Sequence, residues 1–199
     1  MTKQEIRKKF LEKRKALSEA DYVRMNLSLI AHFFSGVDLT FVRVLHTFLP
    51  IAGNQEPDTW SIMDRIRREF PHIRVSLPRV AAGDHLENIY YEGPQQLQTS
   101  SWGIQEPRQG IPTPPEKIDL VIVPLLAIDK QGYRVGYGRG YYDRLLKQTR
   151  KDSAKVGLSF FPPVDAIDDV AEYDVPLTLC VTPEEVVSFD HTQGPPRRA

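Results

Sequence analysis

The feature that most constrains the fold of this chain is a run of four apolar residues, Leu-Val-Ile-Val at positions 120–123. A strand with one face in water alternates apolar and polar residues, whereas a strand covered on both faces is apolar throughout. Sheets covered on both faces are mostly parallel, and helices connect their strands. The run therefore predicts a central parallel strand, and with it a three-layer α/β/α domain with a mostly parallel central sheet.

Helix and strand signals alternate along the rest of the chain, as this architecture requires. Helices are expected to begin at a capping box, Thr2 to Glu5, at Ser18 and at Thr59, and Gly36 is expected to end the second of them. A fourth helix is expected over 141–151. Segments rich in β-branched and aromatic residues predict the further strands 41–49, 73–77, 88–91, 155–160 and 178–181.

The length of 199 residues fits one domain, which we place at 1–189. The polar, proline-containing end of the chain, 190–199, is expected to be a disordered tail. Prolines are frequent between 93 and 115, and no regular element is expected there. Pro78 is expected to end the strand 73–77, because proline has no amide hydrogen for a sheet.

Charge and hydropathy exclude several classes of protein. Lysine and arginine number 26, as do aspartate and glutamate, so no net charge draws the chain to nucleic acid or to an anionic membrane. No segment approaches the roughly 20 apolar residues of a membrane span. The first residues lack the apolar core of a signal peptide, which predicts a cytoplasmic protein. Cys180 lies in an apolar segment and is expected to be a buried strand residue.

A glycine-rich segment between an expected strand and an expected helix carries the main chemical signal. Gly136, Gly138 and Gly140 alternate with other residues, and Arg139 lies among them. Glycines let backbone amides approach a ligand, and a following helix start favours an anion. Asp143 could hold a Mg²⁺ that bridges phosphates. The segment fits neither a P-loop nor a dinucleotide fingerprint, so the residues alone leave a tight surface turn and an anion-binding loop both open.

The whole stretch from Pro124 to Arg144, Pro-Leu-Leu-Ala-Ile-Asp-Lys-Gln-Gly-Tyr-Arg-Val-Gly-Tyr-Gly-Arg-Gly-Tyr-Tyr-Asp-Arg, resembles the signature of the 5-formyltetrahydrofolate cyclo-ligase family. The similarity extends over most of the chain. It includes the N-terminal Lys-x-x-x-Arg, the segments 77–79 and 101–104, and Tyr-Asp-Val-Pro-Leu at 173–177. The family's scaffold is similar to that of sugar-phosphate isomerases and CoA-transferases.

The resemblance implies a set of site residues. The implied ATP-binding residues are Lys3, Arg7, Arg134, Gly136, Gly138, Arg139, Gly140, Tyr141 and Tyr142. The implied substrate-binding residues are Ile51, Glu56, Trp102, Tyr137, Gly138, Arg139, Gly140 and Tyr141. Arg139 and Tyr141 are the implied catalytic residues, and Asp143 and Asp174 are the implied Mg²⁺ ligands. The chain departs from the commoner family pattern at Tyr137, Arg139, Tyr173 and Thr178.

Each of these residues also has a plain structural interpretation. Lys3 and Arg7 could form a solvated basic face of a helix, and Glu56 could be a loop carboxylate. Tyr141 and Tyr142 could pack at a helix start, and Trp102 could anchor its loop.

The resemblance implies ATP- and Mg²⁺-dependent cyclisation of 5-formyltetrahydrofolate to 5,10-methenyltetrahydrofolate. The expected partners are small molecules, without nucleic acid or membrane, in a monomer or weak homo-oligomer. A sugar-phosphate isomerase, a CoA-transferase-like enzyme and a non-catalytic folate or nucleotide binder are the alternatives, because fold analogy does not carry function.

Overall fold

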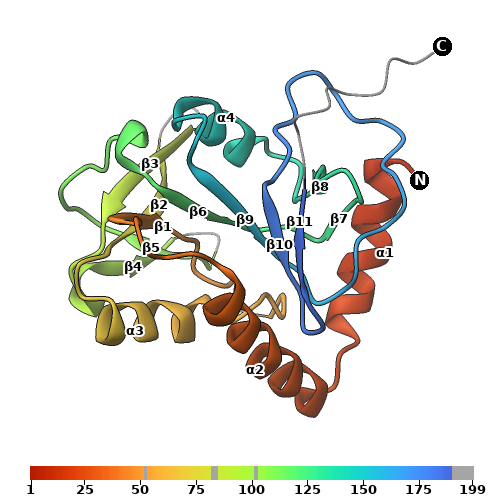
Figure 1. Cartoon of the computed structure of the whole chain (residues 1–199), viewed down its shortest axis with the longest axis horizontal. Helices are drawn as coiled ribbons and strands as arrows, with labels where there is room; N and C mark the ends of the chain where they lie inside the picture. The colour runs from red at the N-terminus through yellow and green to blue at the C-terminus, as the bar shows by residue number, and fades with distance from the viewer. Residues whose placement is uncertain (52, 82–84, 101–102, 190–199) are drawn as a thin grey trace.

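A seven-stranded sheet forms the centre of the molecule (Figure 1). The computed structural model describes residues 1–51, 53–81, 85–100 and 103–189. The strands of this sheet are β1 (Val44–His46), β2 (Arg74–Ala81), β3 (His85–Tyr90), β6 (Leu120–Val123), β9 (Ala154–Leu158), β10 (Leu179–Val181) and β11 (Val186–Ser188). Their order is β11-β10-β9-β6-β1-β2-β3. The five inner strands are parallel, and the two edge strands are antiparallel to their neighbours.

The apolar run that predicted a central strand is β6, the middle strand of the seven. It pairs in parallel with β1 on one side and with β9 on the other. All four of its side chains are fully buried, because helices cover both faces of the sheet at this point. The predicted mostly parallel, doubly covered sheet is confirmed.

Three of the α-helices among the described residues provide this cover. α2 (Glu19–Gly36) and α3 (Thr59–Glu69) pack against one face, and α4 (Tyr141–Gln148) lies on the other (Figure 1). α1 (Lys3–Lys15) begins at the predicted capping box, in which Thr2 and Glu5 bond each other's backbone amides. Within the described ranges, none of these helices combines the length and the apolarity that a membrane crossing requires.

The connections place a topological switch point between β1 and β6. From β1 the chain passes through α3 to β2 on one side, whereas β6, the next inner strand along the chain, lies on the other side of β1. Open α/β sheets bind ligands in the crevice outside the carboxyl ends of the strands at such a point. The segments that follow β1 and β6, which begin at Thr47 and Pro124, are therefore the first place to look for a site.

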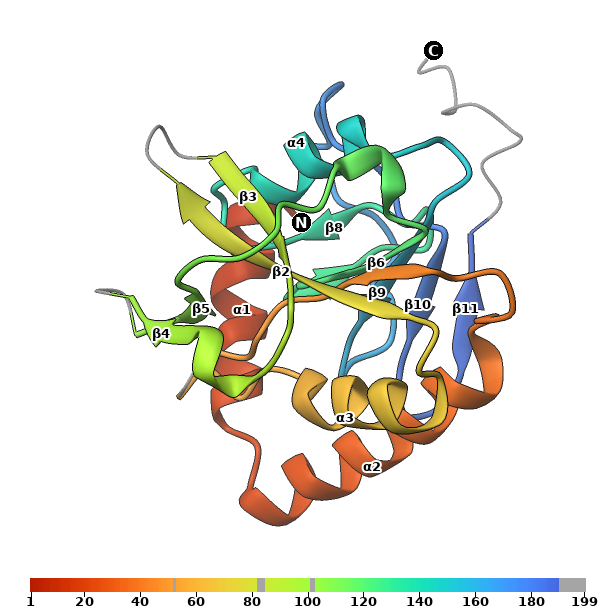
Figure 2. The same cartoon turned by 90° about the vertical axis from the view of Figure 1, so that its left-hand side faces the viewer.

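Two small ribbons stand outside the main sheet. β7 (Ala127–Ile128) and β8 (Arg134–Val135) form one, and α1 packs on it through Ile6 and Phe10. β4 (Leu97–Thr99) and β5 (Gln105–Pro107) form the other, between the 3₁₀ turns Pro94–Gln96 and Pro115–Lys117. In Figure 2 α1 and the β4–β5 ribbon both lie toward the left of the picture, whereas Figure 1 shows them on opposite sides of the sheet. The expectation of no regular element between 93 and 115 was therefore wrong.

Two expected strand ends were also wrong. The strand expected over 41–49 is confined to β1, because the chain leaves the sheet after His46. The strand expected to stop before Pro78 continues to Ala81, paired with β3. β1 pairs with β2 only as far as Ser76, so Pro78 lies beyond that neighbour, where its missing amide hydrogen breaks no bond to β1. The predicted tail, 190–199, lies outside the described residues.

Candidate active site

A cavity of about 800 Å³ lies at the predicted place, outside the carboxyl ends of β1 and β6. Phe48 and Leu49, which follow β1, form part of its wall, and Pro124 follows β6. Its other walls come from the start of α1, β2, β3 and β8, the segment 104–106, the loop 136–140, the first turn of α4, and the residues Ile51, Asn54, Glu56, Tyr173 and Asp174. Segments far apart in the sequence therefore meet at one site.

The glycine loop, which we define as residues 136–140, connects β8 to α4 along one wall of the cavity. Gly138 and Gly140 have φ of +91° and +67°, a left-handed conformation that other residues adopt only with strain. Gly140 is the N-cap of α4 and provides no side-chain cap. The first amides of α4 are thus left without a capping side chain at the cavity wall, where an anion would find both hydrogen-bond donors and a favourable helix dipole.

The cationic side chains that line the cavity differ in how many bonds they make to other groups of the protein. Arg139 is exposed, and none of the described residues forms a hydrogen bond or ion pair with its guanidinium. Arg7 donates from Nε to the Gly136 carbonyl at 2.9 Å, which places its guanidinium against the glycine loop. Its nearest guanidinium atom lies 3.3 Å from the position that a Cβ on Gly138 would occupy. Arg7 and Arg139 thus place two cations beside the glycine loop.

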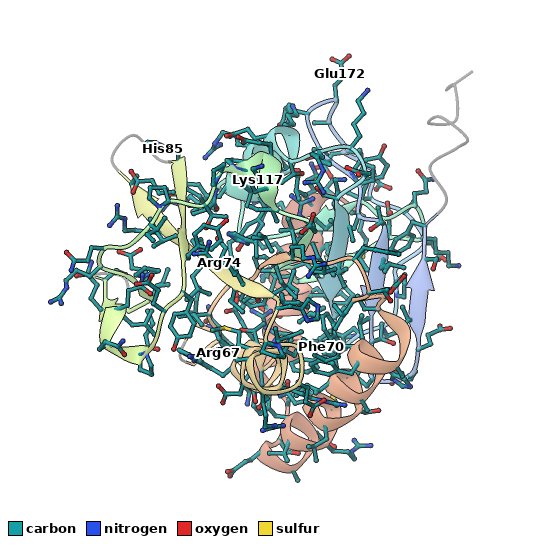
Figure 3. All side chains as sticks on the ribbon, turned by 60° about the vertical axis from the view of Figure 1, so that its left-hand side comes forward. Arg67, Phe70, Arg74, His85, Lys117 and Glu172 are labelled. Atoms are coloured by element: carbon teal, nitrogen blue, oxygen red, sulfur yellow. The ribbon has the colours of Figure 1, made fainter. Side chains whose placement is uncertain are left out.

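Lys3 and Arg134 are engaged with the two predicted metal ligands. The Lys3 ammonium forms an ion pair with Asp174 Oδ2, which also accepts from the Ala171 amide at 2.6 Å. Arg134 Nη2 donates to Asp143 Oδ1 at 2.8 Å, and the Val175 amide donates to the same oxygen at 3.0 Å. Asp174 lies on the loop between β9 and β10, from which Glu172 points outward in Figure 3.

A buried carboxylate, Glu56, also lines the cavity and contacts the glycine loop through Tyr137. Its Oε2 accepts from the Ile51 amide at 2.7 Å, and its Oε1 accepts from the Tyr137 hydroxyl. Burial raises the pKa of Glu56, while the bonds from Tyr137 and Ile51 and the charge of Arg14 lower it. Burial, followed by the neighbouring Glu56 charge, raises the pKa of the Tyr137 phenol.

The apolar part of the cavity provides a surface for a flat ring. The side chains that form it are Phe48, Leu49, Ile51, Pro78, Val80, Leu86 and Ile104. Tyr142 lies behind the first turn of α4, edge-on to His46 with 5.9 Å between ring centroids. Burial raises the pKa of Tyr142 and lowers that of His46 to about 4, so both are neutral near pH 7.

The structure brings together nearly all of the residues that the sequence singled out. Lys3, Arg7, Ile51, Glu56, Arg134, Gly136, Tyr137, Gly138, Arg139, Gly140, Tyr141, Tyr142, Asp143 and Asp174 all line the cavity. Trp102 lies outside the described residues. The roles of all these residues in binding and catalysis remain predictions.

Sequence reasoning missed Arg14, which bonds the Tyr137 hydroxyl from behind the cavity. A signal for it was present. Lys3, Arg7 and Arg14 are spaced i, i+4 and i+11, which places them on one face of a helix. It also missed Asn54 and the apolar residues Phe48, Leu49, Val80 and Leu86, which carry no motif.

The fold and the cavity define an α/β protein with a small-molecule site at the switch point of its sheet. Comparison with known proteins gives the family. A model described as the 5-formyltetrahydrofolate cyclo-ligase family matches residues 1–183, so this chain belongs to that family of ligase enzymes.

Individual relatives agree with this assignment. A 5-formyltetrahydrofolate cyclo-ligase of Escherichia coli K12 is 25% identical over 178 residues, covering 88% of this chain and 97% of the relative. One from Mycoplasma genitalium is 39% identical over 67 residues, or 33% of this chain, and this match spans only 41% of that relative. The NMR structure of Aquifex aeolicus 5,10-methenyltetrahydrofolate synthetase has a TM-score of 0.73 and 31% identity. That match covers 98% of this chain and 99% of the Aquifex chain.

Proposed function

We propose that this chain catalyses the ATP- and Mg²⁺-dependent cyclisation of 5-formyltetrahydrofolate to 5,10-methenyltetrahydrofolate, with release of ADP and phosphate. The observation that carries the proposal is that one cavity is lined both by a glycine loop, whose Arg139 has no bonding partner among the described residues, and by the buried carboxylate Glu56. Such a cavity offers one wall to phosphates and another to a heterocycle with paired hydrogen-bond donors. Family membership and the names of the relatives support the same reaction.

The chemistry requires activation of a formyl group. The formyl oxygen attacks the γ-phosphorus of ATP, the bond from that phosphorus to the β,γ-bridging oxygen breaks, and ADP leaves. N10 then attacks the formyl carbon and loses its proton, and expulsion of phosphate leaves the 5,10-methenyl bridge. No protein nucleophile is required, so the work of the protein is positioning and stabilisation of charge.

On the nucleotide side, we assign the phosphates to the glycine loop and to Lys3, Arg7 and Arg139. The uncapped amides at the start of α4 would donate to phosphate oxygens. Arg139 can reach these oxygens without breaking a bond to a described residue, whereas Lys3 must first break its ion pair with Asp174. Arg134 donates to Asp143 and to the Val175 carbonyl, so we assign it to holding Asp143 in place.

On the folate side, we assign the pterin to Glu56 and to the apolar wall. A pterin presents a ring N–H and an amino group side by side, and a carboxylate matches this pair. Each oxygen of Glu56 already accepts one hydrogen bond and has a further lone pair for a ligand. Tyr137 lies between the two walls, since it belongs to the glycine loop and donates to Glu56.

The residues present fit a magnesium ion. Mg²⁺ usually takes one or two carboxylates and completes its shell with phosphate oxygens and water. Asp143 and Asp174 both line the cavity, and each has one oxygen, Oδ2 and Oδ1 respectively, to which none of the described residues donates. These two oxygens would hold the ion. Bound there, it would neutralise phosphate charge.

The test is a spectroscopic assay for the methenyl product, run in parallel with an assay for ADP. We expect both products to form in equal amounts, and neither to form when ATP or 5-formyltetrahydrofolate is omitted. ATP hydrolysis without folate, or folate binding without turnover, would refute the proposed reaction and favour the alternative enzymes or a binding protein.

The Arg139→Ala variant tests the nucleotide wall. A charge-assisted hydrogen bond contributes about 1.5–3 kcal/mol, so kcat/KM for ATP should fall by about tenfold to a hundredfold. Arg68→Ala, which removes an exposed arginine from α3, is the matched control and should behave as the unaltered protein. Equal kinetics for Arg139→Ala and Arg68→Ala would remove Arg139 from the site.

A further inference from the structure

A buried arginine, Arg14, lies behind the cavity and does not line it. Its side chain is only 4% exposed, although arginine is among the residues least often buried. It lies on α1, more than one turn beyond Arg7. Its Nη2 atom lies 3.8 Å from Oε1 of the Glu56 carboxylate. A buried cation of this kind must be fully bonded, or it destabilises the fold.

The guanidinium of Arg14 joins three segments of the chain. Nε donates to the Asn54 carbonyl at 2.8 Å, in the loop that carries Glu56. Nη1 donates to the Leu125 carbonyl at 3.2 Å, just after β6. Nη2 donates to the Tyr137 hydroxyl, in the glycine loop. Each nitrogen of the guanidinium donates to another segment of the protein, and Arg14 does not line the cavity, so it acts on a ligand through its neighbours.

The Tyr137 hydroxyl completes a chain of bonds. It accepts from Arg14 and donates to Glu56 Oε1, and the Asn54 side-chain amide lies 3.3 Å from the same hydroxyl. The folate wall and the nucleotide wall are thus joined through one phenol group, and Arg14 fixes the orientation of that group. Lysine could supply the charge but not three bonds in a fixed plane.

We propose that Arg14 is a positioning residue that holds the Glu56 carboxylate and the Tyr137 hydroxyl in place between the two walls of the cavity, so that Glu56 can receive the pterin. This inference deepens the proposed function and rests on its assignment of Glu56 to the pterin. Arg14 is absent from the cavity wall, so its effect on folate binding must pass through Glu56 and Tyr137.

The protonation state of Glu56 gives a readout that a purely structural role would not change. Burial raises the pKa of Glu56, and the charge of Arg14 opposes that effect. The other titratable groups around Glu56 are Tyr137, Tyr22, Tyr142 and Asp58. Arg14 supplies the positive charge that lowers the pKa of the Glu56 carboxyl. Loss of this cation therefore raises the pKa of the Glu56 carboxyl further.

The experiment measures 5-formyltetrahydrofolate binding without ATP, by calorimetry between pH 5 and pH 8. The variants are Arg14→Met, Arg14→Lys and Glu56→Gln, with Lys9→Met as the control for loss of an exposed α1 cation. In the unaltered protein, binding should weaken at low pH as Glu56 becomes protonated. In Arg14→Met this weakening should begin at a higher pH than in the unaltered protein, because the cation that lowers the pKa of Glu56 is gone. Lys9→Met should follow the unaltered protein.

Arg14→Lys keeps the charge but lacks the planar guanidinium. It tests the positioning role by itself if Arg14→Met does not fold. Its binding should weaken over the same pH range as in the unaltered protein, but at every pH its affinity should be lower. Affinity in Arg14→Lys equal to that of the unaltered protein at every pH would overturn the positioning role, whatever Arg14→Met does. If Arg14→Met folds and weakens over the unaltered protein's pH range, the inference also fails.

The Glu56 titration can also be followed without ligand. The ¹³C signal of the Glu56 carboxyl, assigned by its loss in Glu56→Gln, should titrate at higher pH in Arg14→Met. If it does so while Glu56→Gln binds folate normally, the assignment of Glu56 to the pterin is wrong, and the inference falls with it. If Glu56→Gln binds folate poorly and the carboxyl signal titrates unchanged in Arg14→Met, only the inference fails. The two failures are therefore distinguishable.

Discussion

His46 should make the stability of this protein depend on pH in a way that one substitution removes. The residue lies on β1, fully buried beneath α4. Both of its ring nitrogens lack a hydrogen-bond partner among the described residues, as do Asn88 Oδ1 and the Tyr142 hydroxyl. Burial lowers the pKa of His46 from 6.5 to about 4, although the neighbouring Asn88 side chain acts weakly in the other direction.

The sign follows from proton binding in the two states. Between pH 6.5 and pH 4 the unfolded chain holds a proton on this histidine and the folded chain does not. Acid therefore favours unfolding, and the stability is lost as pH falls through this window. From the pKa values of 6.5 and about 4, the two states differ at pH 5 by a factor of about 30 in proton binding, which is about 2 kcal/mol.

The assay is urea unfolding of the unaltered protein and of His46→Phe, at pH 7.5 and at pH 5. Phenylalanine keeps a flat ring against Tyr142 and cannot be protonated. The free energy of unfolding of the unaltered protein should fall by about 2 kcal/mol more than that of His46→Phe between the two pH values. Comparing each protein with itself cancels any constant difference in packing.

His72→Gln is the matched control, since it removes an exposed histidine and should lose stability as the unaltered protein does. Equal losses for the unaltered protein and His46→Phe would refute the argument. They would show that His46 takes up its proton in the folded state as readily as in the unfolded one.

Two further predictions concern Asp143 and a glycine turn. Asp143→Asn should lower turnover sharply and raise the Mg²⁺ concentration needed for half-maximal activity, and a normal Mg²⁺ dependence would remove Asp143 from the metal site. The same change weakens the ion pair with Arg134, whose side chain is only 6% exposed, so melting temperature should fall by a few degrees. Gly132→Ala should destabilise by several kcal/mol, because φ is +85° and the added Cβ would lie 2.8 Å from the Leu177 carbonyl oxygen. Gly53→Ala, with φ of +80° and open space, should cost only about 1 kcal/mol, and equal costs measured by urea unfolding would contradict the steric argument.

The parts of the fold that sequence could predict are those whose signals are local. The apolar run 120–123 specifies a strand covered on both faces wherever its neighbours lie, and Thr2 with Glu5 specifies a helix start within one turn. The glycine loop was recognised because positive φ at Gly138 and Gly140 demands glycine. Its contact with Glu56 depends on the order of strands, which no local pattern encodes.

The parts that sequence could not predict depend on distant partners. β4 and β5 pair across a proline-rich segment because β5 packs against β2, which supplies a surface that the segment itself does not reveal. Arg14 looks like one more cation on a basic helix. Its burial follows from carbonyls at Asn54 and Leu125, 40 and 111 residues away, and from the phenol of Tyr137. Without those acceptors the sequence favours solvent exposure for it.

The long separations within the cavity have a consequence for how this protein folds and how ligands stabilise it. Arg7 and Gly136 are 129 residues apart, and Lys3 and Asp174 are 171 apart. Contacts between residues so far apart in the sequence form late and make folding slow. A truncated or partly synthesised chain would therefore lack the cavity. A ligand bound there interacts only with the complete native state. Its binding energy should therefore stabilise the whole domain against unfolding and proteolysis, as one cooperative unit.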